Sequence, residues 1–251
     1  MDNTGKFSDK VANYVKYRST YPDAFLNYLF NEVGLSSDAC VADVGAGTGL
    51  LTEPLAERVK TIYAIEPNRN MRIACMEACG RNCSFIALDG TAEDTGIPDH
   101  SVDFITVAQA FHWFDRNRAH QEFTRIIKPE GLVILVWNSR IPESALTLEN
   151  DALYRKHCPD FTGFSGGRES SVEQFLFFFR DETYEIRSFP NDRILTLEAF
   201  IGNSLSASYA PHPSDAGYNA FVAELSVLFD RYAKKGHLTV PMRTWSYTGR
   251  V

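Results

Sequence analysis

The chain has 251 residues, which is long enough for one sizeable hydrophobic core or for a core that carries a small second subdomain. Its 25 basic and 32 acidic residues give a net charge of −7, which argues against a broad phosphate-binding face and therefore against a nucleic-acid partner, although not against a local basic groove. A content of 44% hydrophobic and 23% charged residues excludes a disordered, collagen-like or coiled-coil chain, and the 13% share of aromatic residues is unusually high.

The first residues, 1–6, are polar and lead into no apolar segment of the kind found in secretory signals. No apolar run approaches the roughly 20 residues that a membrane span needs. The five cysteines are an odd number, which fits reduced thiols better than a disulfide framework. We therefore expect a cytoplasmic protein with no membrane partner, and a monomer or a homodimer.

Residues 1–37 are predicted to be helical, with Pro22 in a first helical turn and Gly34 as the C-cap. From residue 40 to residue 138, short apolar runs alternate with amphipathic stretches. This alternation predicts βαβ units and hence a parallel sheet with helices on both faces. The predicted strands are 40–44, 61–65, 84–88, 102–107 and 132–137.

The second half of the chain does not continue this alternation. We expect it to form an insertion and the edge of the sheet, not an independent domain. Residues 140–182 are predicted to form helices and loops. A strand at 183–190, helices near 196–205 and 215–234, and a last strand at 238–247 follow. The two late strands can pair at the edge of the sheet.

Cys75, Cys79 and Cys83 recur every four residues, and closely spaced cysteines can be metal ligands. The iron–sulfur loop of radical enzymes reads C-x3-C-x2-C, whereas here the second gap is also three residues. A spacing of four is typical of one buried helix face. We therefore expect small packed side chains and no metal.

The most informative motif lies where the first strand ends, because residues 41–49 read VADVGAGTG. Glycines at 45, 47 and 49 allow the backbone to approach a ligand closely. A nicotinamide dinucleotide loop reads G-x-G-x-x-G and needs glycine at position 50, which is Leu50 here. The spacing therefore favours a nucleoside ligand that has no diphosphate. Glu66 at the end of the second strand, about twenty residues past the first glycine, can accept both hydroxyls of a ribose.

At this point the sequence resembles the class I S-adenosylmethionine-dependent methyltransferases, over residues 38–138 closely and over the flanks loosely. The VADVGAGTG loop is similar to the first motif of that family, and AIEP at 64–67 to its ribose motif. GTAED at 90–94 and IPD at 97–99 resemble its adenine motif, in which Thr91 replaces the usual acid. SVDFI, AQAFHWF and RIIKPEG, at 101–105, 108–114 and 125–131, resemble its fourth strand, the loop after that strand, and the approach to its fifth strand.

The resemblance implies a single methyltransferase domain with a Rossmann-like, doubly wound, mostly parallel seven-stranded sheet and an antiparallel edge strand. Residues 1–37 would form an N-terminal helical lid and 38–138 the cofactor-binding core. Helical insertions at 139–182 and 191–236 would cap the active site, with edge strands at 183–190 and 238–247. AFHWF and the opening pattern Y-x-x-Y-R-x-x-Y-P at 14–22 are similar to small-molecule methyltransferases of the trans-aconitate and ubiquinone-biosynthesis type.

The resemblance also implies roles for individual residues toward S-adenosyl-L-methionine. Gly45 and Gly47 would host its amino acid head, Asp43 would orient the loop, and Arg18 would pair with the carboxylate of the head. The full cofactor-binding set is Arg18, Asp43, Gly45, Ala46, Gly47, Glu66, Pro67, Thr91, Ala92, Glu93 and Gln109. Tyr14, Tyr17, Phe111 and Trp113 would contact the acceptor, and His112 is the candidate general base.

Other functional classes remain open from the sequence. A DNA amino-methyltransferase would carry a proline-rich loop after the fourth strand, and residues 108–114 contain no proline. An NAD-dependent oxidoreductase is the alternative enzyme. A non-catalytic regulatory protein that binds S-adenosylmethionine is a third possible function. Of the 32 aromatic residues, 8 fall in residues 38–138 and 17 in residues 139–251, which predicts an aromatic pocket for a small organic acceptor outside the cofactor core.

Overall fold

The computed structural model describes residues 20–80, 84–164, 177–207 and 209–251. The predicted site residues Tyr14, Tyr17 and Arg18, and the third cysteine of the repeat, Cys83, lie outside the described residues.

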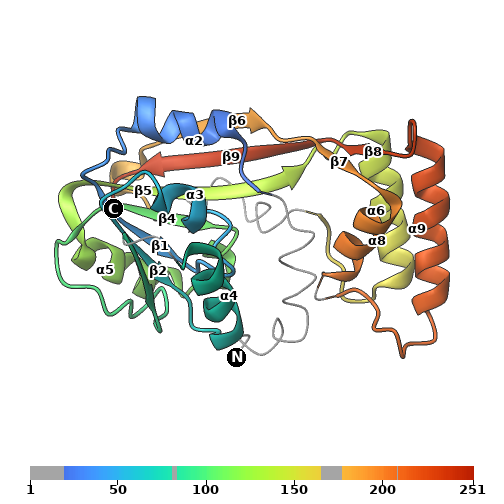
Figure 1. Ribbon diagram of the computed structural model, residues 1–251, viewed down its shortest axis with the longest axis horizontal. Coiled ribbons are helices and arrows are strands. Elements are labelled where there is room, and N and C mark those ends of the chain that lie inside the picture. Colours follow the sequence, from blue (N-terminus) through green and yellow to red (C-terminus); the bar gives the residue numbers. More distant parts are fainter. Residues whose placement is uncertain (1–19, 81–83, 165–176, 208) are drawn as a thin grey trace.

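A seven-stranded sheet forms the centre of the larger lobe (Figure 1). Its strand order is β3-β2-β1-β4-β5-β9-β6, and neighbouring strands from β3 to β5 are parallel. The one antiparallel strand, β9, pairs with both β5 and β6, so it lies one place in from the edge and β6 forms the edge. The strands are β1 (Cys40–Val44), β2 (Thr61–Ile65), β3 (Phe85–Leu88), β4 (Val102–Ala108), β5 (Ile127–Arg140), β6 (Tyr184–Pro190) and β9 (Met242–Gly249).

Helices cover both faces of this sheet because its strands are apolar on both sides. On one face, α2 (Asp23–Tyr28), η2 (Leu29–Val33) and α3 (Thr52–Ala56) pack against β1, β2 and β5. On the other face, α5 (Arg116–Ile126) packs against β4 and β5. Gly34 ends η2 with φ of 92°, as expected of a C-cap.

Cys75 and Cys79 lie buried on α4 (Arg69–Cys79), where they pack against Ala64 of β2. They belong to a helix face, as the spacing of four predicted. Among the described residues there is no group of three or more His, Cys, Asp or Glu side chains that could hold a metal ion.

The remaining elements form a second lobe, which we call the cap (Figure 1). The cap has its own hydrophobic core, to which α6, α8 and α9 each contribute buried side chains. Its elements are α6 (Ala145–His157), β7 (Arg193–Leu195), α8 (Leu197–Leu205), α9 (Tyr218–Tyr232) and β8 (Leu238–Val240). Two short 3-10 helices, η3 (Phe111–Trp113) and η4 (Arg180–Glu182), complete the described structure.

The prediction of one last strand over 238–247 is wrong in one respect, because Pro241 divides it. Proline has no N–H to donate to a sheet ladder. The part before it, β8, pairs with β7 in a separate two-stranded sheet of the cap, and the part after it, β9, joins the main sheet. The chain thus crosses from the cap back to the core at this proline.

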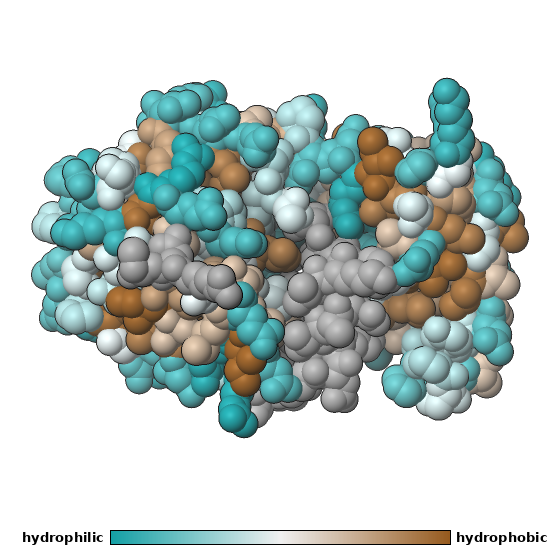
Figure 2. All heavy atoms as spheres, viewed as in Figure 1, coloured by the Kyte–Doolittle hydropathy of each residue, from teal (hydrophilic) through white to brown (hydrophobic). Residues whose placement is uncertain are grey.

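Figure 2 shows hydrophobic residues on the visible face of the cap, next to hydrophilic ones. Exposed large apolar side chains of the cap include Leu148, Ile194 and Val227. Among the described residues, no helix is long and apolar enough to span a membrane.

Candidate functional site

The glycine loop leaves β1 at the carboxyl edge of the sheet, and all three of its glycines have positive φ. A Cβ on Gly45 would lie 2.5 Å from the Cβ of Ala110 in the loop after β4. A Cβ on Gly49 would lie 2.9 Å from the Cys75 sulfur on α4. These two glycines are therefore required by close approach of neighbouring elements as well as by backbone conformation.

Gly47 has a different environment, because a Cβ there would meet no atom of the described residues within 4 Å. Its N–H donates a 2.9 Å hydrogen bond to Oε2 of Glu66. The Asn68 N–H donates to Oε1 of the same carboxylate at 2.8 Å. The loop and the end of β2 thus meet at Glu66, and open space lies above Gly47.

Glu66 is 7% exposed, and burial raises the pKa of its carboxyl above the ordinary value. Each of its oxygens accepts one backbone N–H and retains a lone pair for a further donor. A carboxylate held in this way is suited to accept the hydroxyls of a ribose lying over Gly47. The residues present therefore fit the cofactor that the resemblance implies.

Asp43 is buried beneath the loop and does not reach its surface. Its carboxylate accepts hydrogen bonds from the hydroxyls of Thr52, at 2.5 Å, and Thr106, at 2.8 Å. Burial raises its pKa to about 6. Asp43 therefore joins β1 to α3 and β4 from beneath the loop, which agrees with the orienting role expected of it. Its place in the cofactor-binding set stays a prediction.

The loop after β3 carries the predicted adenine motif. Thr91 is exposed and its hydroxyl accepts the Glu93 N–H at 3.2 Å, whereas Ala92 is buried. Oε1 of Glu93 accepts the N–H of Asp115, the N-cap of α5, at 2.8 Å. Glu93 therefore holds the loop after β3 to the start of α5.

The loop after β4 begins at Gln109, which has a positive φ of 59°. Its side-chain amide donates to the backbone oxygen of Asn138 at 3.0 Å, so it ties β4 to the carboxyl end of β5. Thr20 is the first described residue, and its backbone oxygen accepts from the Asn138 side chain at 3.2 Å. Thr20, where the described part of the chain begins, therefore lies at this same edge of the sheet.

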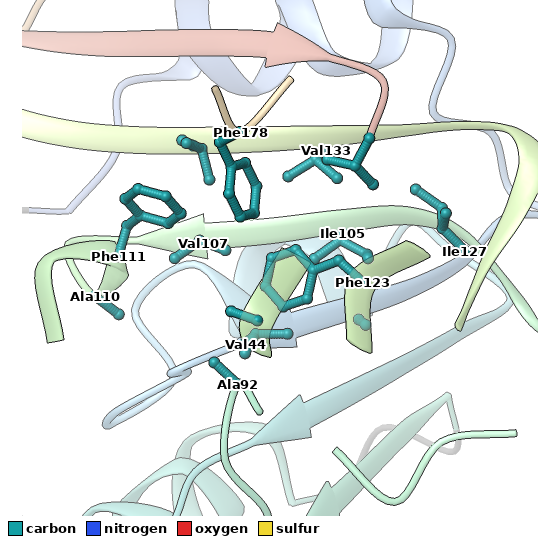
Figure 3. Close-up of a cluster of buried hydrophobic side chains, with 14 of the residues drawn as sticks. Val44, Ala92, Ile105, Val107, Ala110, Phe111, Phe123, Ile127, Val133 and Phe178 are labelled. Carbon is teal, nitrogen blue, oxygen red and sulfur yellow. The ribbon is translucent and has the colours of Figure 1, made fainter. Parts of the chain in front are cut away.

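Phe111 lies in the core and not at the surface of this loop (Figure 3). Its ring packs edge-on against Phe178 and Trp137, with centroid distances of 4.7 and 6.2 Å. The expectation that Phe111 contacts the acceptor is not supported by this packing. Trp113 is 46% exposed and remains available as a wall of an acceptor site.

His112 lies between these two aromatic residues, and its ring centroid is 4.8 Å from that of Trp113. Its Nδ1 is buried and has no hydrogen-bond partner in the part of the chain that the structure describes. Burial lowers the pKa of the imidazole to about 4, because the charged form is poorly solvated there. At neutral pH the ring is thus uncharged and can accept a proton.

Pro67 follows Glu66 directly and is partly exposed. Its backbone oxygen accepts from Arg72, which also forms an ion pair with Asp89 at 2.8 Å. Pro67 therefore belongs to the turn that holds the end of β2, where Glu66 lies, against α4. The backbone N–H of Ala46 donates to the oxygen of Ile65 at 3.1 Å, which fixes the glycine loop to the same strand end.

Sequence reasoning missed two polar residues of the cap junction, Arg140 and Asn150. Arg140 is the last residue of β5, and Asn150 is fully buried on α6. The signal available in the sequence was the polar triplet Asn138-Ser139-Arg140, which follows a continuous apolar strand at the functional edge of the sheet.

Comparisons with known proteins agree with this geometry. Residues 42–135 match the family model described as a methyltransferase domain. An uncharacterised methyltransferase of Mycobacterium tuberculosis is 37% identical over 139 residues, which is 55% of this chain and 54% of that protein. The match therefore spans about half the length of such mycobacterial relatives.

A methyltransferase-like protein of Schizosaccharomyces pombe is 26% identical over 249 residues, covering 96% of this chain and 94% of that protein. Among solved structures, a type II methyltransferase from Anaeromyxobacter dehalogenans superposes with a TM-score of 0.68 at 22% identity, over 93% of this chain and 98% of that one.

A methyltransferase from Thiobacillus denitrificans, solved with S-adenosyl-L-homocysteine, superposes with a TM-score of 0.55 at 15% identity over the whole of both chains. These structural likenesses concern the fold alone. The strand order, the glycine loop and the acid at the end of β2 agree with the match of residues 42–135 to a methyltransferase domain. The core of this chain is therefore similar to methyltransferases in sequence and in fold.

Proposed function

We propose that the protein transfers a methyl group from S-adenosyl-L-methionine to a small organic acceptor. The observation that carries this proposal is the Gly47–Glu66 contact, which presents a buried carboxylate beside open space at the carboxyl edge of β1 and β2. The bound sulfonium supplies the electrophilic methyl group, and the protein aligns the acceptor and excludes water.

Within this proposal, Glu66 binds the ribose, and the glycine loop lies beside the amino acid head. Residues 91–93 lie beside the adenine. His112, in η3 after β4, accepts a proton from a hydroxyl or amine acceptor; its uncharged imidazole at neutral pH supports this role. A carboxylate acceptor would need no such base.

The alternative, an NAD-dependent oxidoreductase, is less well supported by the loop. Leu50 packs against the core that includes α2 and α3, and the helix that follows the loop, α3, has only five residues. A pyrophosphate is normally held at the N-terminus of a helix that packs closely against the glycine loop. This chain offers a short helix and no third glycine at that position.

Binding can be tested by isothermal titration calorimetry with S-adenosyl-L-homocysteine. We expect a dissociation constant on the order of micromolar for the wild type and no measurable binding for Glu66→Ala. Glu77→Ala, which changes an exposed glutamate on α4, is the matched control and should bind as the wild type does. Thermal unfolding of each variant separates loss of the ligand contact from loss of the fold.

Binding of NAD with no heat from S-adenosyl-L-homocysteine would contradict the proposal and support the oxidoreductase. A separate turnover assay with S-adenosyl-L-methionine and a panel of hydroxyl, amine and carboxylate acceptors tests catalysis. Cofactor binding without methyl transfer to any acceptor would instead support a regulatory protein.

A further inference from the structure

Arg140, at the junction between sheet and cap, is a partly buried arginine with no counter-ion among the described residues. It makes no ion pair with any carboxylate in the described part of the chain, and its buried Nη1 has no hydrogen-bond partner. Burial lowers the pKa of the guanidinium, and the groups that act on it electrostatically are two tyrosines, Tyr154 and Tyr209. A guanidinium carries five N–H donors, and leaving a buried one unpaired is costly.

A second unpaired polar group lies on the adjacent helix. Asn150 of α6 is 0% exposed, and both its side-chain nitrogen and its side-chain oxygen lack a hydrogen-bond partner. Asn150 precedes Tyr154 by four residues, so the two side chains lie on the same face of α6. That face is the one from which Tyr154 acts on Arg140.

Aromatic rings surround this polar pair. The Arg140 Cζ lies 4.2 Å from the centroid of the Phe164 ring, in a cation–π contact. The Phe164 ring is 4.8 Å from that of Tyr154, and Phe161 is 5.1 Å from Tyr154. Arg140 and Asn150 are thus connected through Tyr154, and aromatic rings lie beside both Arg140 and Tyr154.

The strand register places this group beyond the cofactor-binding edge of the sheet. Val136 of β5 pairs with Ala108, the last residue of β4, and Arg140 follows four residues later. At about 3.3 Å per residue, Arg140 lies roughly 13 Å past the end of β4, in the direction in which the glycine loop leaves β1. An acceptor molecule that reaches His112 from the side of the cap would pass this group.

We propose that Arg140 and Asn150 bind a carboxylate of the methyl acceptor, whose apolar or aromatic portion packs against Phe164 and Tyr154. This inference rests on the proposed function. A planar carboxylate matches the fork of the guanidinium, and its single charge matches a single cation assisted by a neutral amide. Inorganic phosphate, with a higher charge and a tetrahedral shape, matches less well.

Benzoate and benzamide are the probes, because they differ in charge but have nearly the same shape. We expect calorimetry to show benzoate binding to the wild type in the millimolar range and benzamide binding at least about tenfold more weakly. Arg140→Met and Asn150→Leu should each weaken benzoate binding at least about tenfold. Arg140→Lys, which keeps the charge but not the fork, should show an intermediate loss.

The matched control is Arg155→Met, which changes an exposed arginine of α6 beside the same aromatic cluster. It should leave benzoate binding unchanged. All variants should bind S-adenosyl-L-homocysteine within about twofold of the wild type. Arg140→Met should also unfold at the same temperature as the wild type or a higher one, because it removes an unpaired buried charge.

Three results would overturn the inference: equal binding of benzoate and benzamide, tighter binding of phosphate than of benzoate, or unchanged benzoate binding in Arg140→Met. A lower unfolding temperature for Arg140→Met with benzoate binding retained would make Arg140 a structural residue. The benzoate titrations are run with and without S-adenosyl-L-homocysteine. If S-adenosyl-L-homocysteine does not bind but benzoate does, the proposed function is contradicted. The benzoate titration without S-adenosyl-L-homocysteine still tests the carboxylate site.

Discussion

His112 and Asp43 are buried titratable side chains at the carboxyl edge of the sheet, and burial shifts the pKa of each away from its ordinary value. The imidazole of His112 is held uncharged, and the carboxyl of Asp43 is held partly protonated near pH 6. The largest cause of both pKa shifts is burial, which disfavours the charged form of each group, and not a neighbouring charge.

If His112 is the general base, His112→Ala should lower kcat by about 10²- to 10⁴-fold and leave the affinity for S-adenosyl-L-homocysteine nearly unchanged. The acidic limb of the kcat/KM profile should lie near pH 4, not near 6.5, since burial disfavours the imidazolium. His212→Ala, at an exposed histidine, is the control. Equal losses of turnover and of cofactor affinity would show a binding or structural residue instead.

Asp43 makes the stability of the fold depend on pH in the direction opposite to that of a salt-bridged carboxylate. Its pKa is about 3.8 when unfolded and about 6 when folded, so its contribution is complete below pH 3.8 and is lost as the pH rises through 6. The loss between pH 4.5 and 6.5 is about 2 kcal/mol, from 1.36 kcal/mol per pKa unit. Asp43→Asn removes this dependence.

Urea unfolding of the wild type and Asp43→Asn at four pH values between about 4.5 and 7.5 measures this difference. The free energy of unfolding of the wild type minus that of the variant should fall by about 2 kcal/mol over this range, most of it before pH 6.5. A constant difference would show that Asp43 is ionised throughout.

At the scale of elements, Glu122 joins α5 to the loop that follows the adenine motif. Its carboxylate accepts from the Thr95 N–H at 2.8 Å, the Thr95 hydroxyl at 2.6 Å, and Arg125 at 2.7 and 2.8 Å. These bonds lower the pKa of Glu122 to about 2. The helix and the loop are therefore fixed relative to each other by one carboxylate that is nearly inaccessible to solvent.

Glu122→Gln should lower the free energy of unfolding at pH 7 by about 3 kcal/mol, because it leaves Arg125 and Thr95 incompletely paired. Glu130→Gln breaks an exposed ion pair with Arg250 and should cost less than about 1 kcal/mol. The difference in the free energy of unfolding between the wild type and Glu122→Gln should be present above pH 4.5 and disappear as the pH falls toward 2. Equal costs for the two variants would contradict the role given to Glu122.

At the scale of the whole molecule, the core was predictable because its signals are local. Each parallel strand is a short apolar run, and the glycine loop and Glu66 lie at strand ends that the pattern itself identifies. The cap was less predictable. The pairing of β7 with β8 joins segments more than forty residues apart, and nothing local indicates which strand lies opposite.

In the candidate site, too, the sequence predicts features that depend on neighbouring residues but not those that depend on distant ones. The AFHWF phrase does not reveal that Phe111 packs into the core while Trp113 remains exposed, because the packing depends on Phe178 and Trp137 from elsewhere in the chain. Likewise, Arg140 looks like an ordinary charge at a strand end. That no described carboxylate pairs with it depends on the packing of the cap, which the sequence does not reveal.

The position of β9 has a consequence for how the protein is made. β9 lies between β5 and β6, yet it begins some fifty residues after β6 ends. On the ribosome, both neighbours are therefore synthesised before the strand that separates them, and each presents unpaired backbone edges until residues 242–249 arrive. Until residues 242–249 are synthesised, the edges of β5 and β6 stay exposed unless another molecule covers them. A translational pause before residue 242 should therefore favour aggregation.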